Sequence, residues 1–116
     1  MTGGSSIACR PGDVVLVPFP FRDGLAERAR PPVVVSSDAY NVRGDVIVAA
    51  VTSHSPRDEF DHALSDWVAA GLRLPSTVRM LLATVAADRI LHQTGRLNND
   101  HWSLVQNRIG KAISIV

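Results

Sequence analysis

The sequence predicts a mainly β protein of the α+β class, in which a small curled sheet or barrel packs against one helix. Three observations predict this class. Runs of apolar, β-branched residues occupy most of the chain, prolines and polar loops separate these runs, and the last segment has the clearest helical period. Strands that are followed by one closing helix are typical of a small sheet with the helix packed against it.

The length and composition indicate one globular domain. The 116 residues suffice for one domain and are too few for two, and 46% of them are hydrophobic. We expect residues 1–11 to be a flexible tail and residues 12–116 to form the domain. The net charge of +1 excludes a polybasic protein whose whole surface attracts nucleic acid.

The sequence favours a cytoplasmic protein. Its single cysteine, Cys9, cannot form an intramolecular disulfide, which suits a reducing compartment. The first residues lack the basic and apolar regions of a secretory signal. No apolar stretch approaches the roughly 20 residues that cross a bilayer, so we expect no membrane association.

The first strand is predicted at residues 13–21, which are apolar and β-branched. Pro18 and Pro20 limit its pairing, because proline has no backbone N–H to donate to a neighbouring strand. The next residues are charged and contain an Asp-Gly turn signal, so we expect an exposed loop at residues 22–30.

Further elements are predicted where apolar runs recur between polar segments. Strands are expected at residues 32–36, 45–51, 77–85 and 90–94, with a polar connection between the first two of these. Residues 62–71 are predicted to form a short internal helix that Gly71 ends.

The clearest helix begins at Asn99. Its apolar residues recur at helical spacing and form one face: Trp102, Val105, Ile109, Ala112, Ile113 and Val116. We expect Asn98 or Asn99 to cap this helix, and Asp100 suits the positive end of its dipole.

Several common catalytic and metal-binding patterns are absent. The sequence has no nucleophile elbow, no glycine-rich phosphate loop and no cysteine pair for zinc. The spacings of His54, His62, His92 and His101 match no metal motif, so we expect no metal and no cofactor. The acidic run at residues 58–61 is typical of a solvated loop.

Polar residues at strand ends predict a phosphodiester site. Arg30 directly precedes one predicted strand and Thr52 follows the next, so antiparallel pairing would place both at one rim of the sheet. Arg79 lies in a predicted strand whose neighbouring residues are apolar, so we expect it to be buried, and a buried arginine needs a partner. The alternative is that Arg30 pairs with Glu27 or Asp38 and that Thr52 only caps a loop.

Five segments of the chain resemble the PemK/MazF toxin family in their order and spacing. They are residues 12–21, 30–41, 44–53, 66–72 and 75–79, of which the Arg-Pro at residue 30 and the Thr-Ser at residue 52 are the most specific. The resemblance implies an SH3-like small β-barrel with a short internal helix and a C-terminal helix, which works as a homodimer.

The resemblance also implies an activity and a partner. Members of this family are toxins that cleave single-stranded RNA, chiefly mRNA, at selected sequences without a metal ion, and a cognate antitoxin inhibits them. By position, Arg30 matches the catalytic arginine of the family and Thr52 its active-site threonine. Ser53 and Arg79 match positions that contact RNA or assist catalysis in some members.

The expected RNA groove combines cations with stacking surfaces. Arginine binds phosphate through its planar fork, and single-stranded RNA is also recognised by stacking on rings. The residues expected to bind RNA are Phe21, Arg22, Arg28, Ser53, His54, Arg57 and Arg79.

The sequence departs from part of the family at two positions that supply candidate acid and base groups. A histidine in the first loop is replaced by Gly24 or Leu25, and an aspartate two residues beyond Arg79 is replaced by Leu81. Two alternatives therefore stay open. One is a non-catalytic, CcdB-like inhibitor of a protein target such as gyrase, and the other is a degenerate member that only binds antitoxin.

Overall fold

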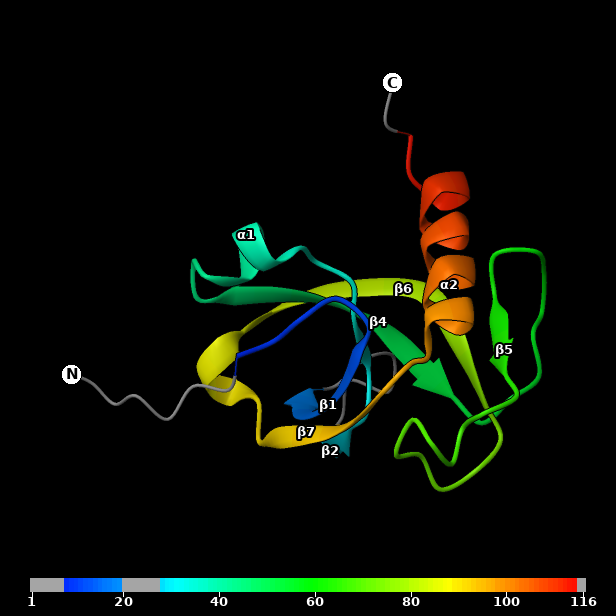
Figure 1. Cartoon of the computed structure of the whole chain (residues 1–116), viewed down its shortest axis with the longest axis horizontal. Helices are drawn as coiled ribbons and strands as arrows, with labels where there is room; N and C mark the ends of the chain where they lie inside the picture. Colours follow the sequence, from blue (N-terminus) through cyan, green and yellow to red (C-terminus); the bar gives the residue numbers. More distant parts are fainter. Residues whose placement is uncertain (1–7, 20–27, 115–116) are drawn as a thin grey trace.

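The computed structural model describes residues 8–19 and 28–114 (Figure 1). Phe21 and Arg22, two of the residues expected to bind RNA, lie outside this part of the chain, as does most of the predicted tail and first loop. The described elements are β1 (Asp13–Phe19), β2 (Arg28–Arg30), β3 (Val33–Val34), α1 (Asp38–Asn41), β4 (Asp45–Thr52), β5 (His62–Leu64), β6 (Ser76–Ala86), the 3-10 turn η1 (Ala87–Arg89), β7 (His92–Arg96) and α2 (Asn99–Ala112).

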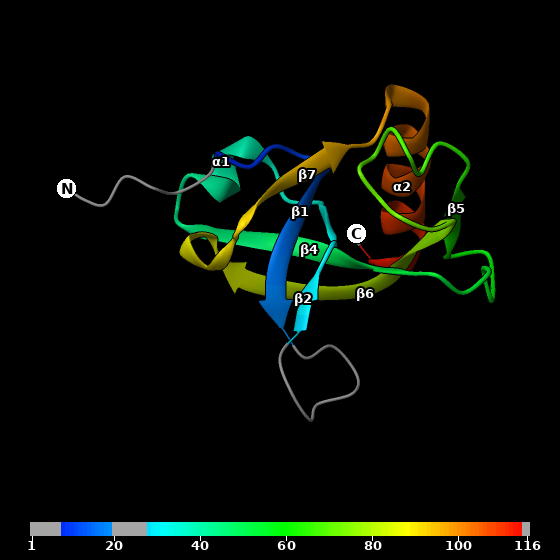
Figure 2. The same ribbon diagram turned by 90° about the horizontal axis from the view of Figure 1, so that it is seen from below.

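The strands form one antiparallel sheet in the order β2-β1-β3-β4-β6-β5, and β7 also pairs with β1. The mainly β class with a C-terminal helix is therefore confirmed. In the described residues the pairing does not close into a barrel, because β5 pairs with β6 alone and leaves an open edge. Figure 2 shows how strongly the sheet curls, with β1 crossing over β4 and β6.

Two predictions along the chain were wrong. Residues 28–30 form β2 rather than an exposed loop, because they pair with the end of β1. Residues 62–71 are not a helix: His62, Ala63 and Leu64 pair with β6, and a turn follows. Gly71 does end that turn, at a φ of 81° that favours glycine.

The core has two parts, which share β1. Val14 belongs to the cluster under α2, whereas Val15 and Val17 belong to a second cluster with Val34 and others, and all four side chains are fully buried. Successive side chains of a strand point to opposite faces, so a strand buried on both sides contributes to both clusters.

The strand β7 is joined to β1 by side chains as well as by backbone pairing. Asp13 at the start of β1 is buried, and its carboxylate accepts hydrogen bonds from Arg96 Nη1 at 2.6 Å and Gln93 Nε2 at 3.1 Å. These charged contacts tie the last strand of the chain to the first.

The C-terminal helix α2 begins as the sequence predicts. The side chain of Asn98 accepts a hydrogen bond from the backbone N–H of His101 at 2.8 Å, which caps the helix. Val105 is fully buried, and Trp102 and Ile109 pack against the same cluster. The helix therefore covers the sheet near β5 and β6 (Figure 1).

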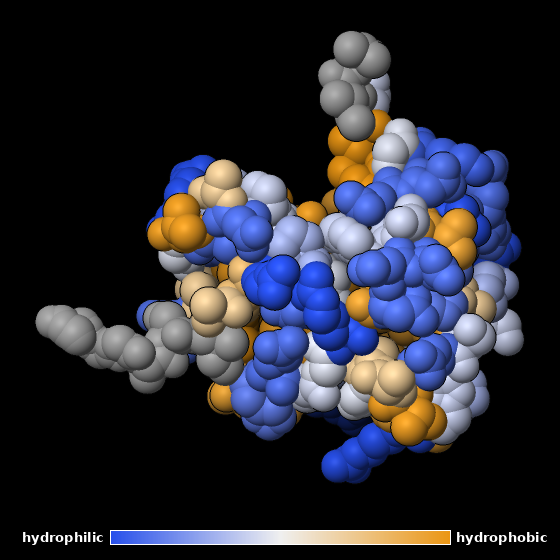
Figure 3. All heavy atoms as spheres, in the orientation of Figure 1, coloured by the Kyte–Doolittle hydropathy of each residue, from blue (hydrophilic) through white to orange (hydrophobic). Residues whose placement is uncertain are grey.

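The face shown in Figure 3 is mostly hydrophilic. Its apolar residues lie in separate small patches rather than in one continuous surface. Scattered exposed apolar residues are normal and do not by themselves mark a docking site. Within the described residues, no helix is long and apolar enough to span a membrane.

Candidate functional site

The register of β3 and β4 supports the predicted rim. Val33 lies opposite Ala49 and Val34 opposite Val48, so the antiparallel pairing of these two strands is confirmed. The same register extended by three residues would set Arg30 opposite Thr52. Pro31 and Pro32 interrupt the pairing there, and Arg30 lies instead opposite Val17 of β1.

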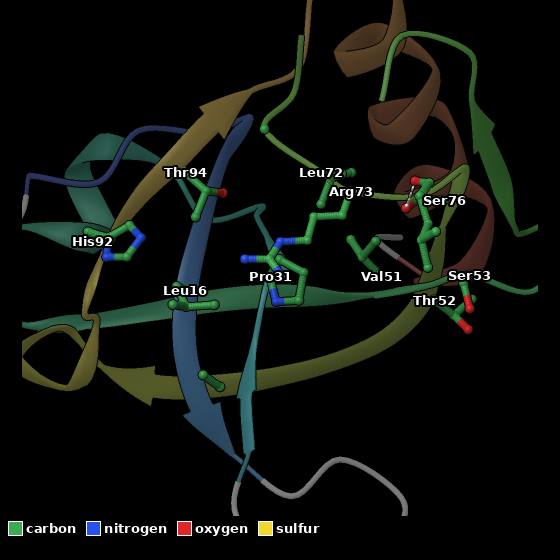
Figure 4. A pocket seen from close by; sticks show the side chains of 13 residues that line it. Leu16, Pro31, Val51, Thr52, Ser53, Leu72, Arg73, Ser76, His92 and Thr94 are labelled. Atoms are coloured by element: carbon green, nitrogen blue, oxygen red, sulfur yellow. Dashed lines mark hydrogen bonds between the residues drawn. The ribbon is translucent and has the colours of Figure 1, made fainter. Parts of the chain in front are cut away.

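A cavity of about 620 Å³ opens at this rim (Figure 4). Its walls come from β1, from the ends of β2 and β4, from the turn after β5, from the start of β6 and from β7. The apolar lining includes Leu16, Pro31, Val51, Leu72 and Leu74. The polar lining consists of Thr52, Ser53, Arg73, Ser76, His92 and Thr94. An apolar cavity with a few convergent polar groups is the usual form of a ligand site.

Thr52 and Ser53 lie in the cavity wall where β4 ends. The hydroxyl oxygen of Thr52 accepts a hydrogen bond from the backbone N–H of His54 at 3.3 Å, which fixes the turn out of the strand. The proton of that hydroxyl is left to donate to another group. Thr52 is half-buried, whereas Ser53 and His54 are exposed.

Arg30 lies at the end of β2 and is half-buried. Its neighbours Ala29 and Pro31 both line the cavity, but the side chain of Arg30 is not among the lining groups in the described part of the chain. The structure thus brings the backbone at Arg30 and the hydroxyls of Thr52 and Ser53 to one rim. That the Arg30 guanidinium and the Thr52 hydroxyl share one cleft stays a prediction.

Arg28 and Arg57 are exposed, and they lie at different places. Arg28 starts β2, opposite Phe19. Arg57 lines a second hollow of about 340 Å³, together with Asp61, Lys111 and others. That hollow lies beside α2 and is separate from the cavity at the rim.

Arg79 does not line the second hollow itself, but its partner Asp61 does. The Arg79 Nε and the Asp61 Oδ2 are 3.5 Å apart, and the two side chains are 18% and 4% exposed. Arg79 thus has the charged partner that a largely buried arginine is expected to need, although its buried Nε makes no hydrogen bond with a described residue. Asp61 itself is buried, contrary to the solvated loop that the acidic run predicted, because Arg79 and the backbone N–H of Arg57 hold its carboxylate.

We expect replacement of Arg79 by methionine to destabilise the fold by about 1 to 3 kcal/mol, because it leaves the buried Asp61 carboxylate without its half-buried cation. The matched control is Arg57→Met. Arg57 pairs with the same oxygen at 3.8 Å but its side chain is 65% exposed, so its loss should cost under about 1 kcal/mol. Urea unfolding measures both values, and equal losses would contradict the assignment.

Two histidines from distant parts of the chain meet between β5 and α2. His62 Nε2 and His101 Nδ1 are 2.8 Å apart, and Ser65 Oγ lies 3.0 Å from the other ring nitrogen of His101. The sequence gives no sign of this pair, because His62 and His101 are 39 residues apart and follow no recognisable motif. Burial first, and then His101 and Arg108, lower the pKa of His62.

The lowered pKa of His62 predicts a loss of stability in acid. Protonation favours the unfolded chain, so stability is complete above the unfolded histidine pKa of about 6.5 and falls as the pH drops below it. His62→Gln should flatten the dependence of unfolding free energy on pH between about 6.5 and 5. His54→Gln, at an exposed site, should leave it unchanged, and a flat wild-type curve would contradict the prediction.

Arg73, His92, Ser76 and Thr94 are lining residues that the sequence analysis missed. His92 is the first residue of β7 in the structure, but the predicted strand at residues 90–94 placed it in the strand interior, so the strand-end criterion that selected Thr52 did not select it. Arg73 follows the Gly71 turn and carries no comparable signal. Within the described residues, no group of three or more histidine, cysteine, aspartate or glutamate side chains is placed to hold a metal ion.

The chain matches one protein family over most of its length. Residues 10–113 match the family described as PemK-like, MazF-like toxin of type II toxin-antitoxin system. No curated protein matches the chain.

Several solved structures share the fold at low sequence identity. An endoribonuclease in complex with its cognate antitoxin, from a mycobacterial species, is 19% identical with a TM-score of 0.74, over 94% of this chain and 98% of that one. A MazE–MazF complex from Deinococcus radiodurans is 20% identical with a TM-score of 0.75, over 95% and 99%. The toxin MazF-mt6 of Mycobacterium tuberculosis is 21% identical with a TM-score of 0.68, over 89% and 95%.

Proposed function

The chain belongs to the PemK/MazF family of toxins of type II toxin–antitoxin systems, and from that premise we propose that it cleaves single-stranded mRNA at selected sequences without a metal ion. The reaction is attack of a ribose 2′-hydroxyl on the adjacent phosphate. The observation that carries the proposal is the cavity at the rim, where Thr52 and Ser53 meet the end of β2 beside Arg30.

The roles of the two proposed catalytic residues follow from charge. Attack on phosphorus builds negative charge on the phosphorane oxygens, and the permanently protonated fork of Arg30 is suited to neutralise it. Thr52 donates its free hydroxyl proton to a phosphate oxygen and so positions the phosphate, since its oxygen already accepts from the backbone. Neither group is suited to take a proton from the substrate.

The RNA strand is proposed to enter along the exposed residues next to the cavity. Ser53 lines the cavity, His54 follows β4 and is exposed, and Arg28 is exposed at the start of β2. Phe21 and Arg22 belong to the same proposal. Arg57 and Arg79 contact RNA only if the strand continues to the second hollow, because Asp61 engages both arginines there.

The proposed partners are a cognate antitoxin and a second copy of this chain. Solved relatives of the same fold include toxins in complex with antitoxins. We propose that an antitoxin segment orders on binding across the rim and presents carboxylates to its arginines. The proposed compartment is the cytoplasm, where mRNA is found.

The test is incubation of the purified protein with a mixed-sequence RNA in EDTA, followed by mapping of the ends. The expected products carry a 2′,3′-cyclic phosphate and a 5′-hydroxyl at a restricted set of sequences. Addition of antitoxin should stop the reaction. Intact RNA together with loss of supercoiling in a parallel gyrase assay would replace the proposal with inhibition of a protein target.

A further inference from the structure

The cavity holds an arginine that has no partner among the residues that the structure describes. Arg73 leaves the turn after Gly71 and extends into the cavity (Figure 4). Arg57, Arg79 and Arg96 each pair with a carboxylate, but Arg73 makes no ion pair or hydrogen bond with any residue that the structure describes. A guanidinium beside an apolar wall attracts an anion whose oxygens can accept two hydrogen bonds from it.

A histidine faces this arginine from the opposite wall. The ring of His92 projects from β7, and Figure 4 shows it and the Arg73 guanidinium pointing toward one another across the cavity. The strand pairing of His92 with Leu16 fixes the position of its backbone. The ring makes no hydrogen bond with a described residue, so both nitrogens are available to a ligand.

The two walls are held together by a close backbone contact. A Cβ atom built on Gly71 would lie 2.1 Å from the carbonyl oxygen of Thr94, and one on Gly95 would lie 2.1 Å from that of Ala70. The turn that carries Arg73 therefore packs directly on the strand that carries His92. The backbone positions of Arg73 and His92 are therefore fixed relative to one another, whereas both side chains are exposed and can adjust to a ligand.

We propose that Arg73 binds the phosphate that is cleaved and that His92 is the general base of the reaction. This inference rests on the proposed function. It assigns a proton acceptor, which neither Arg30 nor Thr52 provides, in a chain where Leu81 replaces one of the acidic groups of the family. It places the cleaved phosphate between Arg73 and His92, at the end of the cavity opposite Thr52 (Figure 4).

The proposed step balances without a further reactant. A ring nitrogen of His92 takes the proton of the 2′-hydroxyl as the bond from the 2′-oxygen to phosphorus forms. The bond from phosphorus to the 5′-oxygen then breaks, and that oxygen takes a proton from water. The imidazolium returns its proton to the resulting hydroxide, so the products are a 2′,3′-cyclic phosphate and a 5′-hydroxyl.

His92→Gln is the first test. We expect kcat to fall by about 10²- to 10³-fold with little change in KM, because only proton transfer is lost. The variant should also lose the fall in rate that protonation of the base produces in wild type at acidic pH, and added imidazole should restore part of the rate.

Two outcomes would overturn the role of His92. One is a variant with wild-type cleavage and an unchanged pH profile. The other is rescue of the variant by a substrate whose 5′-oxygen is replaced by sulfur, because that leaving group needs no proton and rescue would make His92 the acid.

Arg73→Gln is the second test. We expect KM for RNA to rise by about 10- to 100-fold and the salt dependence of binding to weaken by about 0.7 in the log–log slope, as for one lost phosphate contact. Arg73→Lys should recover part of the affinity. Arg43→Gln removes an exposed arginine that packs on Tyr40, away from the cavity, and should behave as wild type.

The outcomes of these experiments distinguish failure of this inference from failure of the proposed function. Wild type that produces no cyclic phosphate ends would refute the proposed function and, with it, the role of His92. Binding of a 2′-deoxy oligonucleotide, which cannot be cleaved, tests Arg73 independently. Cleavage by wild type with unchanged kinetics in both variants would refute the inference alone.

Discussion

Replacing Arg30 by alanine is expected to lower kcat for RNA cleavage by at least about 10²-fold while a stable fold remains. The reason is that its guanidinium is the group proposed to neutralise the phosphorane, and loss of one such donor typically has this effect. Cleavage of a short labelled RNA under saturating conditions measures the change.

Two controls accompany the Arg30 variant. Arg30→Lys keeps the charge and loses the planar fork, so it should remain well below wild type. The thermal midpoint of each variant shows whether the fold survives, which matters because Arg30 makes contacts of its own in the free protein. Undiminished cleavage by a folded Arg30→Ala protein would remove Arg30 from the mechanism.

Among the described glycines, Gly71 is expected to show the largest loss of stability on replacement by alanine, about 3 kcal/mol. Two costs add at this position. The φ of 81° is unfavourable for a residue with a Cβ, and the new atom would lie 2.1 Å from a backbone oxygen of β7. The thermal midpoint should fall by roughly 10 °C.

Three other glycines separate the two costs. Gly44 has a φ of 101° and open space around it, so Gly44→Ala should show the conformational cost alone, about 1 kcal/mol. Gly95 has the close contact without a positive φ, so Gly95→Ala shows the packing cost. Gly110 lies in α2 with open space around it, and Gly110→Ala should stabilise the helix by up to about 1 kcal/mol. A Gly71→Ala protein no less stable than Gly44→Ala would contradict the close contact.

The long strands of the sheet were predictable from local sequence, whereas the short strands at residues 28–30 and 62–64 were not. β4 and β6 are long β-branched runs, so their own composition identifies them. Residues 62–64 have no such signal and become a strand because β6 offers an edge against which His62 and Leu64 bury their side chains. Tertiary pairing decides short segments of this kind.

The candidate site was predictable in part for the same reason. Thr52 follows directly from the end of a recognisable strand. Asp61 and Arg79 meet only through folding of the loop before β5, and Arg73 reaches the cavity only because its turn packs on β7. Contacts between distant segments leave no periodic pattern in the sequence, so a single sequence does not predict them.

The position of β7 makes the cavity depend on two segments that lie far apart in the sequence. Residues 92–96 supply one wall of the cavity and pair with residues 13–16, near the other end of the chain. The cavity can therefore form only after both of these segments have been synthesised, and contacts of such long sequence separation form slowly. The site proposed for RNA cleavage is consequently expected to be among the last parts of the fold to be completed.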